Sequence, residues 1–370
     1  MMHAGPGMTE FVASCSQAAT LNRRAVLGGI GAFMGAGAGR AAVAAGWDAV
    51  VGGGEPGSFS TLGEALDKAR EAGGRLFRIK LAKGFFREKL AITTPNLLIA
   101  GEGRDSVLSF DAAAGLTKPD GGHWGTGGSA TLTINAPGVT LRNLTVRNAF
   151  DFIADQRTHA SGGSQAVALA LSRGVDRTWV DRCWVEGYQD TLYVEGRALF
   201  TRCGIAGGVD FIFGGAAAWF DHCTITTRFV PGAPVQGFVA APSTRRDHPF
   251  GLAFADCRLQ REAGVPDRSA FLGRPWRAGG NMDLVGAAAY LRCWMDGHIR
   301  PEGWSAMGYR DPKGNQQMLE PSEARLVEWD SRGPGAGSAS PMRRLLTAAE
   351  AARFTRADVL AGWSPVPAHE

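Results

Sequence analysis

A short segment recurs in the middle of the chain with a period of 20 residues and no gap. Residues 180–185 (Val-Asp-Arg-Cys-Trp-Val) are followed by residues 200–205 (Phe-Thr-Arg-Cys-Gly-Ile) and 220–225 (Phe-Asp-His-Cys-Thr-Ile). Looser copies occupy residues 254–259, 290–295 and 141–146, the last with Leu144 in the position of the cysteine. Such internal self-similarity is typical of repeat architectures.

Each copy has apolar residues at alternating positions, which indicates a short strand with one buried face. A period of 20 residues leaves no room for a crossover helix beside the strand and its turns, but it suffices for one coil of a parallel β-helix. An antiparallel sandwich would not keep cysteine in the same position over consecutive periods. We therefore predict an all-β fold, a single-stranded right-handed parallel β-helix whose coils stack at about 4.8 Å.

The ends of the coil stack have their own signals. Residues 61–64 (Thr-Leu-Gly-Glu) have the spacing of a capping box, and apolar residues follow at helical spacing until Gly73. This pattern predicts a short helix that covers the N-terminal end of the stack, where unpaired strand edges would promote aggregation. A C-terminal extension follows the last repeat.

The start of the chain has the pattern of a targeting segment. Arg23 and Arg24 precede a weakly apolar, glycine-rich run over residues 25–39, and residues 42–44 (Ala-Val-Ala) fit a cleavage site. The run is too short for a membrane span and resembles a twin-arginine export signal. We assign residues 1–44 to a signal peptide and residues 45–370 to one β-helix domain, exported to the periplasm or the extracellular space. A buried amphipathic helix is the alternative, although glycine supports helices poorly.

Composition excludes several classes of function. Without residues 1–44, the chain holds 36 basic and 34 acidic residues, which is too balanced for binding nucleic acid or a membrane through bulk charge. The sequence contains no Gly-x-Ser-x-Gly, His-Glu-x-x-His or Cys-x-x-Cys segment, so a serine hydrolase or a metal site is unsupported. We expect neither a metal nor a cofactor.

Five cysteines remain after signal removal. Residues in the same position of adjacent coils approach within disulfide range, and an exported protein meets an oxidising environment. We expect a Cys203–Cys223 disulfide. A Cys183–Cys203 bridge and a ladder of buried thiols that only pack are the alternatives.

Two aspartates follow the repeat in the same register. Asp190 lies seven residues after Cys183, and Asp210 lies seven residues after Cys203. Equivalent positions on adjacent coils place the two carboxyl groups on one face, about one strand spacing apart. Two such carboxylates cannot both ionise cheaply, so one should keep its proton near neutral pH and act as an acid beside a nucleophile or base. The alternative is that both aspartates only bond the turns.

Several segments together resemble one known family. Residues 187–193, 210–214 and 272–276 are similar to signature segments of the pectin methylesterase (pectinesterase) family. Residues 165–169 agree as well, whereas residues 84–90 depart slightly from the family pattern Gly-x-Tyr-x-Glu-x-Val. The tail beyond residue 295 resembles bacterial members, and the likeness extends over roughly residues 47–366. The resemblance independently implies a parallel β-helix.

The resemblance also implies catalytic roles. Asp210 corresponds to the nucleophile that forms an acyl-enzyme, and Asp190 to the general acid and base. Gln165 and Gln189 match the glutamines that stabilise the oxyanion. Arg274 matches the arginine that hydrogen-bonds the nucleophilic carboxylate and aims it.

Aromatic residues near these positions should bind the sugar, because pyranose faces pack on aromatic rings. Trp276, Tyr193, Phe213 and Met307 are the residues that we expect to line this subsite. Phe211 fits either the subsite or the core. The expected activity is hydrolysis of methyl-esterified galacturonate in pectin, with release of methanol, by a monomer.

Three other functions stay open at this point. A related β-helix enzyme could use the same acids on another ester or on a thioester. A β-helix could bind polysaccharide without catalysis, although the acids, the arginine and both glutamines are present. A pectate lyase would need clustered acidic calcium ligands, which the sequence does not show.

Overall fold

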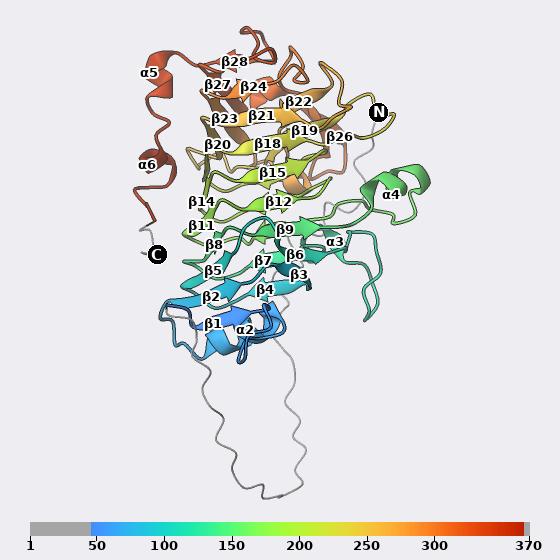
Figure 1. The fold of residues 1–370 in the computed structure, drawn as a ribbon. Helices are drawn as coiled ribbons and strands as arrows, with labels where there is room; N and C mark the ends of the chain where they lie inside the picture. Colours follow the sequence, from blue (N-terminus) through green and yellow to red (C-terminus); the bar gives the residue numbers. More distant parts are fainter. Residues whose placement is uncertain (1–45, 366–370) are drawn as a thin grey trace, which may run out of the picture.

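The computed structural model describes residues 46–365 of the chain. The signal peptide that we assign to residues 1–44 lies outside these described residues. Three long parallel sheets wind around one apolar core and form a column of stacked coils, with the N-terminal coils at one end and the C-terminal coils at the other (Figure 1).

Each complete coil contributes one strand to each sheet, in the order A, B, C, whereas the coils at the two ends lack some of these strands. Sheet A runs through β1 (Ala49–Val51), β2 (Phe77–Leu81), β5 (Leu97–Gly101), β8 (Thr140–Arg142), β11 (Thr178–Asp181), β14 (Ala198–Thr201), β17 (Ala218–Asp221), β20 (Leu252–Ala255), β23 (Ala287–Leu291), β27 (Arg325–Trp329) and β28 (Arg344–Leu345). Sheet B runs through β3 (Gly84–Arg87), β6 (Ser106–Phe110), β9 (Thr145–Asn148), β12 (Trp184–Glu186), β15 (Gly204–Gly207), β18 (Thr224–Thr227), β21 (Arg258–Arg261) and β24 (Trp294–Met295). Sheet C runs through β4 (Leu90–Ile92), β7 (Leu132–Ile134), β10 (Leu169–Leu171), β13 (Leu192–Val194), β16 (Ile212–Gly214), β19 (Gly237–Pro242) and β22 (Ala270–Gly273). The predicted parallel β-helix is confirmed.

The sequence repeat is the structural repeat. Val180 pairs with Phe200, which pairs with Phe220, and the series continues through the looser copies to Phe254 and Tyr290. The rings of consecutive aromatic members stack with their centroids 4.6 Å apart. Stacked rings of this kind fill the core and add to the stability of the coils beyond their buried area.

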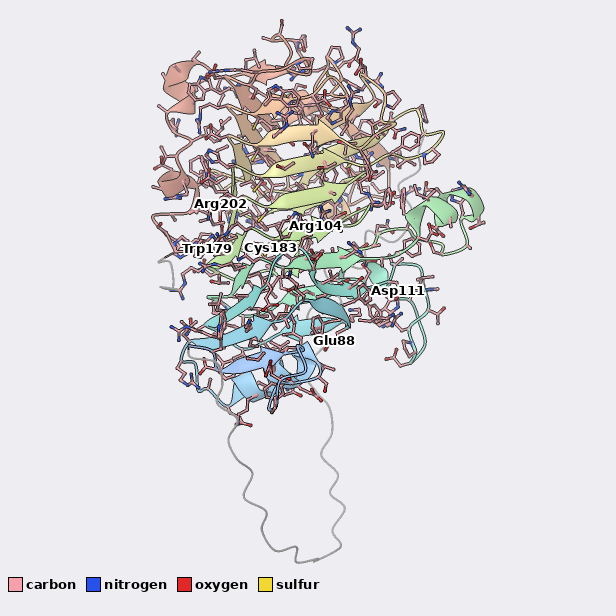
Figure 2. The ribbon with its side chains drawn as sticks, viewed as in Figure 1. Glu88, Arg104, Asp111, Trp179, Cys183 and Arg202 are labelled. Atoms are coloured by element: carbon pink, nitrogen blue, oxygen red, sulfur yellow. The ribbon has the colours of Figure 1, made fainter. Side chains whose placement is uncertain are left out.

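The predicted N-terminal cap is present as α2 (Leu62–Arg70), whose buried residues pack on the core. Thr61 and Glu64 form the expected capping box. Glu88, labelled in Figure 2, adds a second cap, because its carboxylate accepts hydrogen bonds from the backbone N–H groups of Leu62 (2.8 Å) and Gly63 (2.9 Å). A carboxylate at a helix N-terminus satisfies free N–H groups and the helix dipole together.

The repeated segment is a corner, and our prediction that each copy is a single strand was wrong. β11 and β12 are separated by two residues, and the residue before each cysteine has a left-handed backbone: φ is 51° at Arg182, 54° at Arg202 and 52° at His222. A left-handed residue turns the chain sharply from sheet A into sheet B. Arginine rarely adopts this conformation, so the residue types gave no signal for the corner.

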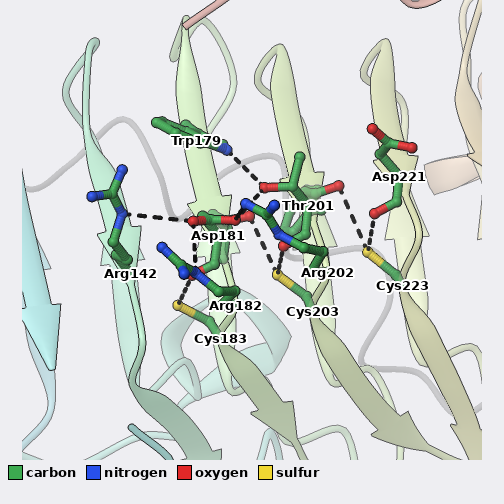
Figure 3. A network of polar contacts seen from close by, with 12 residues as sticks. Arg142, Trp179, Asp181, Arg182, Cys183, Thr201, Arg202, Cys203, Asp221 and Cys223 are labelled. Carbon is green, nitrogen blue, oxygen red and sulfur yellow. Dashed lines mark hydrogen bonds and ion pairs between the residues drawn. The ribbon is translucent and has the colours of Figure 1, made fainter. Parts of the chain in front are cut away.

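A buried carboxylate ties these corners together (Figure 3). Asp181 is 1% exposed and accepts hydrogen bonds from Arg202 Nη2 (2.6 Å) and Arg182 Nε (3.1 Å). Thr201 Oγ1 also donates to it, at 2.7 Å, and Arg142 Nε lies 3.6 Å away. One carboxylate thus connects three adjacent coils and fixes their register at the corner where sheet A turns into sheet B.

The expected Cys203–Cys223 disulfide is not formed, and this prediction was wrong. Both thiols are free, as is that of Cys183. The S–H group of Cys203 donates instead to the carbonyl of Val180 on the preceding coil (3.3 Å), and that of Cys223 donates to the carbonyl of Phe200 (3.6 Å). The alternative of a packed thiol ladder describes the structure.

The C-terminal extension runs along the outer face of sheet A, where α5 (Ala348–Ala351) and α6 (Arg356–Val359) lie beside the column (Figure 1). Leu360 packs there with Trp179 and Trp219, and its carbonyl accepts a hydrogen bond from Arg197 at 2.8 Å. Within residues 46–365, none of the helices has the length and apolarity that crossing a membrane requires.

Candidate active site

The two predicted acids lie on adjacent coils of sheet C. Asp190 precedes β13 and Asp210 precedes β16, and these strands pair Leu192 with Ile212 and Tyr193 with Phe213. The two aspartates are therefore in equivalent positions, and both line the same pocket. Each has a left-handed backbone, with φ of 59° and 50°, which aspartate tolerates better than most residues. The structure thus brings the two acids together as the register predicted.

Arg274 binds one of the two acids in a fork. Its Nε lies 2.8 Å from Asp210 Oδ1 and its Nη2 lies 2.6 Å from Asp210 Oδ2. The arginine follows β22, two coils beyond the acid along sheet C. Asp210 is only 2% exposed, so this bidentate ion pair holds a largely dehydrated carboxylate in one orientation.

Asp190 has the opposite environment. It is also 2% exposed, and its Oδ1 has no hydrogen-bond partner within residues 46–365. Burial raises the pKa of Asp190 well above its ordinary value; the negative charge of Asp210 raises it further, and Arg274 offsets only part of this. A desolvated carboxyl beside a like charge keeps its proton. The burial of Asp190, its unpartnered Oδ1 and its raised pKa together favour the protonated form of this carboxyl.

Of the predicted aromatic residues, Phe213 and Trp276 line the pocket, whereas Tyr193 does not line it and packs against Phe213. Phe213 lies between Tyr193 and Trp276, with ring centroids 4.7 Å and 5.8 Å away. Met307, at the start of the hairpin of β25 (Met307–Arg310) and β26 (Gln316–Leu319), lines the pocket with Phe213 and Trp276. Phe211 is fully buried in the central core, so of its two expected places it occupies the core.

Of the two predicted glutamines, Gln189 lies on the coil of Asp190 and Gln165 on the coil before it, but neither lines the pocket. Gln189 directly precedes Asp190, and its backbone carbonyl accepts a hydrogen bond from the N–H of Ala166 at 3.1 Å. Gln165 is 5% exposed, and its Oε1 has no hydrogen-bond partner in the described part of the chain. Buried amide oxygens normally have partners, so Gln165 Oε1 is an exception among the described residues.

The sequence reasoning missed Thr126, which lines the pocket with the two acids. It belongs to α3 (Gly125–Gly128), in the segment inserted between β6 and β7. Its hydroxyl is buried and has no hydrogen-bond partner among residues 46–365. Long gaps between repeats predict loops that build a groove, but an inserted loop has no periodicity that could single out one threonine.

One group of potential metal ligands lies away from the pocket, at the corner between sheets A and B. Ligand atoms of Asp221, His222 and Asp256 lie within 4.8 Å of one another. These groups already have protein partners: Arg292 binds Asp256 through two hydrogen bonds (2.9 and 2.7 Å), and His222 Nδ1 lies 2.7 Å from Asp221. The arrangement is one of ion pairs.

Comparisons with known proteins agree with this geometry. Residues 48–362 match the family model Pectinesterase. Pectinesterase A of Dickeya chrysanthemi is 38% identical over 327 residues, which cover 83% of this chain and 88% of that protein. The solved pectin methylesterase PemA from Erwinia chrysanthemi superposes with a TM-score of 0.82 at 38% identity, covering 86% of this chain and 98% of that chain. The pectin methylesterase from Yersinia enterocolitica gives a TM-score of 0.79 at 36% identity, covering 83% of this chain and 100% of that chain. The predicted fold and the expectation of an enzyme are confirmed, and the chain belongs to the pectinesterase family.

Proposed function

We propose that this chain hydrolyses the methyl esters of galacturonate in pectin and releases methanol, with Asp210 as nucleophile and Asp190 as acid and base. The observation that carries the proposal is the contrast between two adjacent buried acids: Arg274 binds Asp210 in a fork, whereas the pKa of Asp190 is raised. Unequal environments of this kind assign the two roles. A solved pectin methylesterase in complex with hexasaccharide VII, 38% identical to this chain, supports an oligosaccharide as the ligand.

In the first step, a carboxylate oxygen of Asp210 attacks the carbonyl carbon of the methyl ester. The tetrahedral intermediate collapses, the bond from carbon to the methoxy oxygen breaks, and the leaving oxygen takes the proton of Asp190. Methanol departs and a mixed anhydride joins Asp210 to the galacturonyl group. Asp190 is now an anion.

In the second step, Asp190 accepts a proton from water while the water oxygen attacks the galacturonyl carbon of the anhydride. The bond to Asp210 breaks, and Asp210 leaves as a carboxylate beside Arg274. Asp190 again holds its proton, so both acids return to their initial states. This scheme uses one water for each ester and requires neither a metal nor a cofactor.

Gln165 and Gln189 have amide N–H groups suited to the oxyanion of both tetrahedral intermediates. In this proposal a bound ester orients these N–H groups toward the pocket. Phe213 and Trp276, which line the pocket, pack against sugar faces, and Tyr193 supports the ring of Phe213 from behind. Met307 closes the same side.

We further propose that the protein acts as a monomer after export to the periplasm or the extracellular space. The paired arginines, apolar run and Ala-Val-Ala segment within residues 1–44 support this destination. A polymeric substrate outside the cytoplasm is consistent with it.

The test is methanol release from methyl-esterified pectin by the wild type and by Asp210→Asn. An amide cannot form the anhydride, so we expect turnover to fall by about 10⁴-fold or more. Asp256→Asn is a matched control, because Asp256 also has a left-handed backbone (φ 54°) and also binds an arginine in a fork, yet it lies at the corner between sheets A and B. It should keep wild-type activity.

Four results would each contradict the proposal. Wild-type-like turnover of Asp210→Asn would exclude Asp210 as nucleophile. Cleavage of thioesters without release of methanol would identify a different acyl substrate. Binding of pectin without turnover, or the appearance of ultraviolet-absorbing unsaturated uronides, would indicate a binding protein or a lyase.

A further inference from the structure

On the two coils that follow Asp210 along sheet C, the position equivalent to that of the acids is occupied by an aromatic residue. β16 pairs Ile212 with Ala240, which places Phe238 opposite Asp210, and β19 pairs Phe238 with Phe271. The hydrogen bond from the N–H of Phe211 to the carbonyl of Phe238 (3.4 Å) agrees with this register. The nucleophile thus has an acid as its neighbour on one coil and a phenylalanine on the other.

The ring of Phe238 lies against the arginine that binds the nucleophile. The guanidinium carbon of Arg274 is 4.0 Å from the centroid of this ring, while Nε and Nη2 bind the two oxygens of Asp210. Phe238 is 8% exposed and the Arg274 side chain 19% exposed. A cation over an aromatic face is bound more strongly where water is excluded.

A second phenylalanine lies beside Phe238 on the next coil. Phe271 stacks on it with centroids 5.4 Å apart and planes inclined by 5°. Arg300 lies 5.0 Å from the ring of Phe271, so the same arrangement of arginine on phenylalanine recurs one coil further from the acids. Only the first ring contacts Arg274.

We propose that Phe238 is a positioning residue that acts through Arg274. The flat ring fixes the plane of the guanidinium group, so that both N–H groups stay aimed at the Asp210 carboxylate and the attacking oxygen keeps its direction. An aliphatic side chain of similar size fills the same space without a π face, and the guanidinium group can then rotate. This inference depends on the proposed role of Asp210 as nucleophile.

The central experiment compares kcat and KM for Phe238→Leu, Phe238→Tyr and Phe271→Leu on methyl-esterified pectin. We expect kcat of Phe238→Leu to fall by about tenfold, equivalent to ~1.4 kcal/mol, with KM unchanged, since the ring is proposed to act on the nucleophile through Arg274. Phe238→Tyr keeps the aromatic face and should keep kcat within about twofold of the wild type. Phe271→Leu makes the same chemical change one coil away and should leave kcat unchanged.

A double-mutant cycle with Arg274→Lys tests whether Phe238 affects kcat through Arg274. If the ring acts through the planar guanidinium group, Phe238→Leu should cost little more activity once Arg274 is already lysine. Phe238→Met, whose flexible side chain fills irregular space, repeats the test if the leucine variant does not fold. Thermal unfolding of each variant separates lost positioning from lost structure.

The inference is overturned if Phe238→Leu and Phe238→Met keep wild-type kcat, if Phe271→Leu loses as much activity as Phe238→Leu, or if the losses of Phe238→Leu and Arg274→Lys multiply. Its failure is distinguishable from that of the proposed function. An active Asp210→Asn variant would refute both, whereas an inactive Asp210→Asn with a fully active Phe238→Leu would refute the positioning role alone.

Discussion

Asp181 and Asp190 lie on the same coil and are equally buried, yet they have opposite properties. Asp181 is 1% exposed and Asp190 is 2% exposed. For Asp181 the cost of burial is outweighed by hydrogen bonds from Arg202 and Thr201 and by nearby positive charge, so its pKa lies below the ordinary value. For Asp190 burial dominates and the charge of Asp210 adds to it, so its pKa lies well above.

The two sites differ in how many arginines lie near each carboxylate. At the corner, Arg142, Arg182 and Arg202 surround one carboxylate. In the pocket, Asp190 and Asp210 share the single guanidinium group of Arg274, which binds only one of them. Burial by itself disfavours the charged form of any carboxyl. Local charge therefore decides whether the pKa of a buried acid lies below its ordinary value, as for Asp181, or above it, as for Asp190.

Arg274→Leu should have the largest effect on this contrast. It leaves two buried acids without a cation, and breaking a buried ion pair costs about 3–5 kcal/mol unless Asp210 takes up a proton and ceases to be a nucleophile. We expect methanol release to fall on the order of 10³-fold. Arg300→Leu, which removes the arginine on the next ring of the column, is the control; an equal loss there would contradict a specific role for Arg274.

Asp190→Asn should lower kcat by about 10²–10⁴-fold, the usual contribution of a general acid and base. Wild-type activity should fall as pH rises through the raised pKa of Asp190, because the acid that protonates methoxide is lost. The measurement is a pH profile of methanol release. A profile that stays flat toward alkaline pH would argue against a protonated Asp190.

The two acids should give opposite slopes of stability against pH. The lowered pKa of Asp181 contributes stability that is present above its ordinary value of 3.8 and is lost as pH falls through the folded pKa. The raised pKa of Asp190 has the opposite effect on stability. The contribution of Asp190 to the free energy of unfolding is complete below pH 3.8 and is lost as pH rises through the folded pKa. Urea unfolding at a series of pH values measures both slopes.

In that series, Asp181→Asn should reduce the free energy of unfolding at neutral pH by about 2 kcal/mol, less than a fully buried pair costs because Arg182 and Arg202 reach water. It should also remove the loss of stability in acid and keep catalytic activity. Asp190→Asn should remove the decline with rising pH instead. Equal slopes in both variants would contradict the comparison.

Arg182→Gln should have the smallest effect. Its side chain is 43% exposed, and Asp181 keeps Arg202 and Thr201 as partners. We expect a change below about 1 kcal/mol in the free energy of unfolding and unchanged release of methanol. A loss as large as that of Asp181→Asn would show that the partners of this carboxylate do not replace one another.

The uninterrupted repeats could be predicted residue by residue. A period of 20 aligns Val180 with Phe200 and Phe220, and the same offset aligns Asp190 with Asp210. Side chains in equivalent positions of a coil must point the same way, so periodicity alone brought the two acids together. The motifs around Arg274 and Trp276 then supplied residues that no period connects to the acids.

Features that depend on an interruption of the period could not be predicted in this way. Phe238 follows Asp210 by 28 residues because a loop separates β18 from β19. The 20-residue period therefore did not predict that Phe238 lies beside Asp210. Thr126 lies in another inserted segment. The expected disulfide failed for a different reason, since proximity of Cys203 and Cys223 does not determine whether their thiols bond each other or backbone carbonyls.

By itself the sequence determined the coil, its register and the pairing of Asp190 with Asp210, because a strict period repeats one backbone path and one side-chain direction. Only the tertiary structure decided that the pKa of Asp190 is raised. This pKa depends on the position of Arg274, which comes from two coils beyond Asp210 and binds it, and on the exclusion of water from both carboxyl groups. Electrostatic energies follow distances and burial in three dimensions, which no spacing along the chain records.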